Sequence, residues 1–185
     1  MSEWNAETAE WYAAKYGEYA TNRLAADATE VSPDAVVVDV GCGTGSALRR
    51  LAPRVPHGTL LGLDPVPRML EIARDRAAED PNGHRIEFRE APAENLPLED
   101  DSADVIFAFD SIDHWQDKAA GLQEIRRVLR PDGRLVVVKD GGLPGGVKAK
   151  REFLAELDRA GLSVMQERDL AEDDVTCTMW VCGVA

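Results

Sequence analysis

The stretch from Val36 to Gly45, with the sequence VVVDVGCGTG, constrains the fold of this chain more than any other segment. A short apolar, β-branched run leads there directly into a loop with glycine at every second position. Such a run is typical of a strand buried on both faces of a sheet. The glycines allow a sharp turn and a close approach of the backbone to a ligand. Because residues 46–52 favour a helix, the segment predicts a nucleotide-type binding turn at the carboxyl end of a parallel strand.

The spacing of the glycines separates two classes of nucleotide site. A dinucleotide fingerprint, G-x-G-x-x-G, has its third glycine where this chain has Ser46. Here Gly41, Gly43 and Gly45 alternate instead, and Asp39 precedes them at the end of the expected strand. A purely structural turn and a degenerate dinucleotide loop are the alternative interpretations of this pattern.

A second apolar run, residues 60–63, ends in Asp64 about 20 residues after the glycine loop. An acidic residue at the end of the second strand can accept hydrogen bonds from both hydroxyls of a ribose. Asp64 is also a candidate N-cap for the helix expected around residues 67–78. The two roles are compatible, and the first favours an adenosine-type ligand.

Strands and helices alternate along the chain. We expect strands at 36–40, 59–64, 86–90, 104–109, 134–139, 162–168 and 176–184. We expect helices at 7–28, 45–52, 67–79, 117–129 and 147–160, with a helix-ending turn at 131–133 and a glycine-rich linker at 140–146. This alternation predicts an α/β fold, a Rossmann-like doubly wound sheet with helices on both faces.

Composition narrows the classes of function. A length of 185 residues suits a single domain. No apolar run approaches the roughly 20 residues of a membrane-spanning helix, and the first residues have no secretory pattern, so we expect a cytoplasmic protein without membrane insertion. The three cysteines fit a reducing compartment. A net charge of −13 argues against a nucleic-acid partner, because phosphate backbones are bound mainly by Lys and Arg clusters.

Several motifs, taken in order, resemble one known family. The pattern Asp39-x-Gly41-x-Gly43-x-Gly45 resembles motif I of the class I S-adenosylmethionine-dependent methyltransferases. Residues 36–139 look like the methyltransferase domain of the ubiquinone/menaquinone-biosynthesis type, and the stretches 90–98, 109–117 and 129–135 resemble further family motifs. The resemblance implies a seven-stranded, mostly parallel sheet with an antiparallel last strand, and S-adenosylmethionine as cofactor.

The resemblance also implies roles for individual residues. Asp39 would interact with the methionine amino group, the three loop glycines would line methionine and ribose, and Asp64 would hold the ribose hydroxyls. Ala93 and Glu94 would lie beside the adenine. The family's adenine-binding Asp falls on Pro92 here, so the Ala93 N–H would bond the ring instead. The predicted cofactor-binding residues are therefore Asp39, Gly41, Gly43, Gly45, Asp64, Ala93, Glu94, Phe109 and Tyr16.

Aromatic side chains gather near the N-terminus. Tyr12, Tyr16 and Tyr19 recur at helical spacing and predict one face of a helix. This face either packs on the domain or covers the cofactor, where a tyrosine ring near the sulfonium would make a cation–π contact. We therefore divide the chain into a helical lid, residues 1–30, and a methyltransferase domain, residues 31–185.

His114 is the candidate general base, since an acceptor hydroxyl or ammonium must lose a proton during methylation. A packing or solvent-exposed role for His114 is the alternative. The neighbouring acids Asp110, Asp113 and Asp117 fit no zinc template, so we predict no metal site. The predicted function is methyl transfer to a small-molecule acceptor by in-line displacement. The alternatives are a protein acceptor, a non-catalytic cofactor-binding subunit and, weakest, a dehydrogenase.

Overall fold

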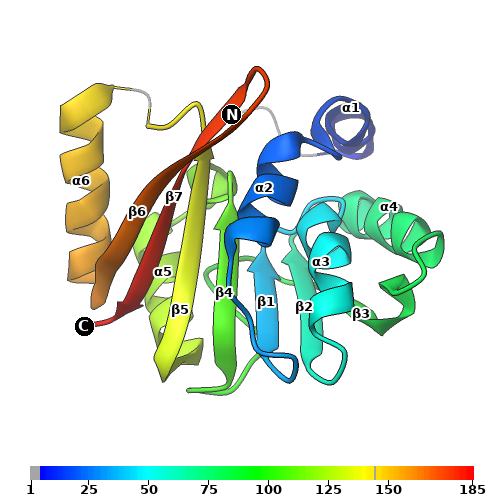
Figure 1. The fold of residues 1–185 in the computed structure, drawn as a ribbon, viewed down its shortest axis with the longest axis horizontal. Helices are drawn as coiled ribbons and strands as arrows, with labels where there is room; N and C mark the ends of the chain where they lie inside the picture. Colours follow the sequence, from blue (N-terminus) through cyan, green and yellow to red (C-terminus); the bar gives the residue numbers. More distant parts are fainter. Residues whose placement is uncertain (1–4, 144) are drawn as a thin grey trace.

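The computed structural model describes residues 5–143 and 145–185, which fold around one seven-stranded sheet (Figure 1). The strand order is β3-β2-β1-β4-β5-β7-β6. Neighbouring strands from β3 to β5 are parallel, whereas β7 runs antiparallel to both β5 and β6. The strands are β1 (Val36–Val40), β2 (Thr59–Asp64), β3 (Ile86–Glu90), β4 (Ala103–Phe109), β5 (Leu129–Asp140), β6 (Leu162–Glu172) and β7 (Val175–Val184). The predicted single-domain, Rossmann-like fold is confirmed, including its antiparallel last strand.

Helices cover both faces of the sheet (Figure 1). One face carries α2 (Ala20–Ala28), α3 (Ser46–Leu51) and α4 (Pro67–Ala78), and the other carries α5 (Lys118–Val128) and α6 (Gly146–Arg159). Side chains of a strand alternate between the faces, so Val37 joins one core cluster and Val38 the other. The short 3₁₀ turns are η1 (Ala52–Arg54), η2 (Gly83–Arg85) and η3 (Ile112–His114).

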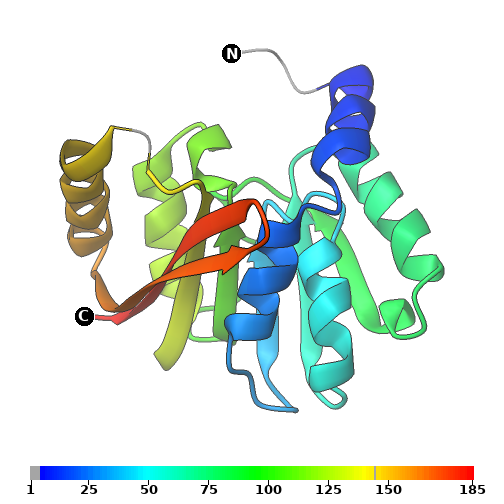
Figure 2. The same cartoon turned by 45° about the horizontal axis from the view of Figure 1, so that its top comes forward.

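The single helix predicted over residues 7–28 is wrong, because the chain forms α1 (Ala6–Tyr16) and α2 with a corner between them. We call Gly17, Glu18 and Tyr19 the 17–19 corner. A Cβ on Gly17 would lie 2.4 Å from the Ala13 carbonyl oxygen and 2.8 Å from Thr44 Cγ2, so only glycine fits this close approach. Figure 2 shows that α1 projects past the corner and lies alongside α4. Residues 1–4 of the predicted lid and Pro144 of the predicted linker lie outside the described residues.

The helix-ending turn predicted at residues 131–133 is also wrong. The helix α5 ends at Val128, and β5 begins directly at Leu129. Leu129 pairs with Ala103 and Arg134 with Val105, so residues 130–133 form an irregularity within the strand. Continuous pairing with β4 begins at Arg134, so the regular part of β5 is the stretch that the sequence predicts.

One edge of the sheet is β6, and the other is β3. The register of β6 against β7 shifts between Val164 and Gln166, at a bulge that leaves Met165 62% exposed. Beyond the bulge the strand carries the charged run Glu167, Arg168 and Asp169. This edge lies away from β1 and β2, whose carboxyl ends form the site described next.

Candidate active site

The glycine loop turns sharply at the end of β1. Gly41, Gly43 and Gly45 have φ angles of +76°, +53° and +73°, in the left-handed region that glycine tolerates. The N–H groups of Gly41 and Cys42 donate to the Leu63 carbonyl at 2.8 and 2.9 Å, which holds the loop against β2. A Cβ on Gly43 would meet no atom within 4 Å, so this part of the loop is open.

Asp64 ends β2 beside this loop. Its Oδ2 accepts the Gly43 N–H at 3.0 Å, and its Oδ1 accepts the Val66 N–H at 2.9 Å. Each carboxylate oxygen has a second lone pair for a further donor. Burial raises the pKa of Asp64 to about 6, although both hydrogen bonds lower it. Asp64 is not the N-cap of α4, because Val66 occupies that position.

Asp39 lies behind the loop, near the end of β1. It is 3% exposed, and its carboxylate has no ion-pair partner among residues 5–143 and 145–185. Burial, and then the charge of Asp64, raise the pKa of Asp39 to about 7. Two neighbouring carboxyl groups held in this way favour a cationic ligand, since a positive charge would stabilise their ionised forms.

A cavity of about 1280 Å³ opens at the carboxyl ends of the strands. It exceeds the roughly 300–1,000 Å³ of a typical small-molecule pocket, so it has room for two ligands. Most of the predicted site residues line it: Tyr16, Gly41, Gly43, Asp64, Ala93, Glu94, Phe109 and His114. Asp39 and Gly45 do not line it. Gly45 instead caps α3, and a Cβ there would lie 2.8 Å from the Phe88 ring.

The loop after β3 contributes Ala93 and Glu94. Ala93 is buried, and the Glu94 Oε1 accepts the N–H of Asp117 at 2.9 Å. The carboxylate of Glu94 therefore also fixes the start of α5. Because Asp117 is the N-cap of that helix, this contact ties the loop after β3 to the segment that follows β4.

Two acids at the carboxyl ends of β4 and β5, Asp110 and Asp140, were not among the predicted site residues. Asp110 has a φ of +50°, and its Oδ1 accepts the Asp140 N–H at 2.8 Å. Both residues line the cavity. Burial raises the pKa of Asp110. Their place at the ends of two central parallel strands is the signal that identifies them, because such ends meet at one edge of the sheet.

His114 lies in η3 and lines the same cavity. Burial lowers its pKa; neighbouring Asp113 raises it, and Lys139 lowers it further. The imidazole is therefore biased toward its neutral form at neutral pH, in which one ring nitrogen can accept a proton.

Three tyrosines border the cavity from the N-terminal side. The ring centroids of Tyr12 and Tyr16 are 5.2 Å apart, and those of Tyr16 and Tyr19 are 6.0 Å apart. Tyr19 is not on α1 as predicted, since it belongs to the 17–19 corner. The corner turns it back toward Tyr16, so the aromatic group persists without helical periodicity.

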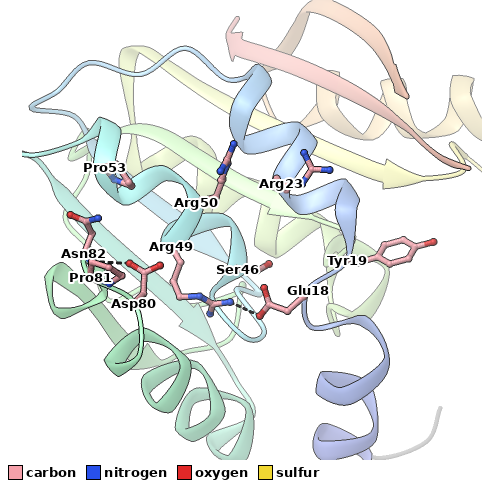
Figure 3. A pocket seen from close by; sticks show the side chains of 10 residues that line it. All are labelled: Glu18, Tyr19, Arg23, Ser46, Arg49, Arg50, Pro53, Asp80, Pro81 and Asn82. Atoms are coloured by element: carbon pink, nitrogen blue, oxygen red, sulfur yellow. Dashed lines mark hydrogen bonds and ion pairs between the residues drawn. The ribbon is translucent and has the colours of Figure 1, made fainter. Parts of the chain in front are cut away.

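Polar contacts join the 17–19 corner to the glycine loop. Thr44 Oγ1 donates to the Gly17 carbonyl at 2.5 Å, and Arg49 donates to the Thr44 carbonyl at 2.6 Å. Glu18 pairs with Arg49, as Figure 3 shows, and also with Arg76. A neighbouring pocket of about 330 Å³ contains three arginines, but each of them is already paired with a carboxylate: Arg23 with Glu172, Arg49 with Glu18 and Arg50 with Asp27.

These contacts predict that Thr44→Val loosens the N-terminal helices. The variant keeps the side-chain shape but leaves the Gly17 carbonyl without its 2.5 Å donor, at a cost of about 1 kcal/mol. Hydrogen exchange should then quicken in α1 and near the corner, with little change in the central strands. Thr59→Val, at the exposed start of β2, is the control. Equal exchange in wild type and Thr44→Val would contradict the prediction.

A family model described as a methyltransferase domain matches residues 38–137. The chain belongs to this family. The predicted membership of the class I S-adenosylmethionine-dependent methyltransferases is thereby confirmed at the level of the family, and the resemblance to the ubiquinone/menaquinone-biosynthesis type is shared by a curated relative of that name.

Curated relatives agree with this assignment, and a solved structure agrees with the fold. Methyltransferase GfsG of Streptomyces halstedii is 40% identical over 124 residues, covering 67% of this chain and 44% of that protein. The ubiquinone/menaquinone biosynthesis C-methyltransferase UbiE of Geotalea daltonii is 33% identical over 118 residues, covering 63% and 50%. The chain thus spans about half the length of the curated relatives that it matches. The fold matches the crystal structure of a SAM dependent methyltransferase from Aquifex aeolicus with a TM-score of 0.79 at 19% identity, over 99% of this chain and 100% of that one.

Among the described residues, no helix of this methyltransferase-family chain is both long enough and apolar enough to cross a lipid bilayer.

Proposed function

We propose that this chain transfers the methyl group of S-adenosylmethionine to a small-molecule acceptor by in-line displacement. One observation carries the proposal: Asp64 is held by the Gly43 and Val66 N–H groups at the edge of a cavity large enough for a cofactor and an acceptor. The name of the Geotalea relative, a quinone-biosynthesis C-methyltransferase, supports a small acceptor.

The residues present fit the cofactor. Asp64 has lone pairs for two ribose hydroxyls, and the open face at Gly43 leaves room beside them. Asp39, buried and without an ionic partner among the described residues, matches the cationic methionine end. The backbone of Ala93, with Glu94, would border the adenine, and Phe109 and Tyr16 would border the remainder of the cofactor. Gly41 and Gly45 would give the loop its shape, and the proposal requires no contact between either residue and the cofactor.

His114 is the proposed base. S-adenosylmethionine, when bound, supplies a methyl group activated by its sulfonium. Held at Asp64 and the glycine loop, it would supply that methyl group to the acceptor atom and leave as a neutral thioether that keeps the electron pair of the carbon–sulfur bond. His114 would then take the proton that the acceptor atom releases, and its depressed pKa keeps it ready to do so at neutral pH.

Residues 1–30 are the proposed lid over the domain formed by residues 31–185. Tyr12, Tyr16 and Tyr19 border the cavity, and the contacts of the 17–19 corner fix this segment to the glycine loop. The proposed location is the cytoplasm, which the three free, buried cysteines support.

Calorimetric titration tests the proposal first. S-adenosylmethionine and S-adenosylhomocysteine should both bind with measurable heat, whereas NAD should not. Methyl transfer from labelled cofactor to a panel of phenols, quinols and amines then tests the acceptor. Label that appears only in added protein would favour a protein acceptor, and binding without transfer to anything would favour a non-catalytic subunit. Binding of NAD but not of S-adenosylmethionine would overturn the assignment.

A further inference from the structure

Lys139 is a charged side chain buried at the carboxyl end of β5. It is 4% exposed and lies between Val138 and Asp140, at the same edge of the sheet as Asp64. A buried ammonium group is costly unless it is paired. Its Nζ donates to Asp113 Oδ2 at 2.6 Å, so the partner of this buried charge lies in the segment that borders the cavity.

Asp113 connects three elements, namely η3, β5 and α5, through its contacts with Lys139 and Lys118. It lies in η3 directly before His114, and its Oδ1 accepts from Lys118 Nζ at 2.9 Å, at the first residue of α5. The turn is also fixed on its other side. The His114 N–H donates to the Ser111 carbonyl at 2.9 Å, and Ser111 Oγ donates to the Val40 carbonyl at 2.7 Å. Lys139 therefore ties the turn that carries His114 to β5.

We propose that Lys139 is a positioning residue for methyl transfer, which acts through Asp113 on the turn that presents His114 to the cavity. The inference rests on the proposed function, because only the proposed methyl transfer makes His114 a general base. Lys139 does not line the cavity, so it would touch neither ligand. It holds Asp113 in place and balances the charge beside the imidazole.

The charges around the imidazole determine how a substitution should shift the pKa of His114. The ionisable groups on the surrounding elements are Asp113 in its own turn, Asp110 after β4, Glu94 after β3, Asp117 and Lys118 of α5, and Lys139 and Asp140 of β5. Of these, Asp113 raises the pKa of His114 and Lys139 lowers it. Removing the charge of Asp113 should therefore lower the pKa of His114, and removing the charge of Lys139 should raise it.

The test is an NMR titration of the histidine side chains in the free protein. The chain has three histidines, so the His114 signals can be assigned by substitution, and His57 and His84 serve as internal references. Lys139→Met should raise the pKa of His114. Asp113→Asn, whose amide oxygen can still accept from Lys139, should lower it further. Lys150→Met is the control, because Lys150 pairs at the surface with Glu167.

Lys139→Met is expected to fold, since Asp113 keeps its contact with Lys118 and no unpaired carboxylate is left inside. With an acceptor found by the panel, its kcat should fall on the order of tenfold from lost alignment. Its Kd for S-adenosylmethionine should stay within about twofold of wild type.

The proposal is overturned if the His114 titration in Lys139→Met matches wild type. It is also overturned if Asp113→Asn raises the His114 pKa, which is the effect of a turn that is merely loosened. If wild type binds no S-adenosylmethionine, the proposed function fails, while the titration still decides the role of Lys139.

Discussion

Asp64→Ala should weaken S-adenosylmethionine binding on the order of 100-fold. The proposed hydrogen bonds from two ribose hydroxyls to a carboxylate contribute about 3 kcal/mol together, which corresponds to that loss in affinity. The variant also removes the acceptors of the Gly43 and Val66 N–H groups, so the glycine loop loses part of its support. Calorimetry measures the affinity, and a thermal melt followed by circular dichroism measures folding.

The control is Asp75→Ala, which removes an exposed acid from α4 without touching the cavity. Its affinity for the cofactor should equal that of wild type. An Asp64→Ala protein that folds and binds S-adenosylmethionine normally would contradict the proposed ribose contact.

The same site predicts a dependence of binding on pH. A raised pKa means that the free protein holds protons on Asp64, near pH 6, and on Asp39, near pH 7. A cationic cofactor favours the ionised carboxylates, so its binding must displace these protons. Affinity should therefore rise as the pH increases from 5 to 8, and Asp64→Ala should flatten the lower part of this profile. A constant affinity over this range would contradict the electrostatic argument.

His114→Ala should lower kcat on the order of 100-fold to 1,000-fold, the usual contribution of a general base. Its affinity for S-adenosylmethionine should not change, because the ribose and methionine contacts are made by other residues. In wild type, the neutral imidazole is the active form. Since burial lowers the His114 pKa, activity should persist to below pH 6.5 and then fall as the imidazole takes up a proton.

His57→Ala is the matched control, since His57 is exposed in a turn before β2 and does not line the cavity. Full activity in His114→Ala would end the proposal of a base at this position. Loss of cofactor binding together with turnover would instead assign His114 to the cofactor site.

Local patterns in the sequence predicted much of the geometry of this candidate site. The alternating glycines and the acid at the end of the next strand are signals carried by a few neighbouring residues. Their chemistry leaves few alternatives: glycine for the left-handed turns at Gly41 and Gly43, and a carboxylate at Asp64. The doubly wound sheet followed from the alternation of strands with helices, and its antiparallel last strand followed from the resemblance to a known family.

The features that sequence analysis missed depend on contacts between distant segments. The corner at Gly17 exists because the chain must approach Thr44, 27 residues later, and this contact leaves no periodic trace in the sequence. Pro131 lies within β5 because residues 130–133 form an unpaired irregularity between two pairings with β4, at Leu129 and at Arg134. In the sequence, Lys139 is simply the polar residue that ends a run of valines. Its proposed positioning role depends on a contact with Asp113, 26 residues earlier in the chain.

The bulge at Met165 has a consequence for how this molecule behaves at high concentration. An outermost strand exposes unpaired N–H and C=O groups to which a strand of another molecule can add. The register shift between Val164 and Gln166 interrupts this row, and the charges at Glu167 and Arg168 follow directly. Such interruptions and charges are the devices by which natural sheets resist fibril-like stacking. Smoothing this bulge or neutralising these charges would therefore favour aggregation without altering the end of the sheet that carries the candidate site.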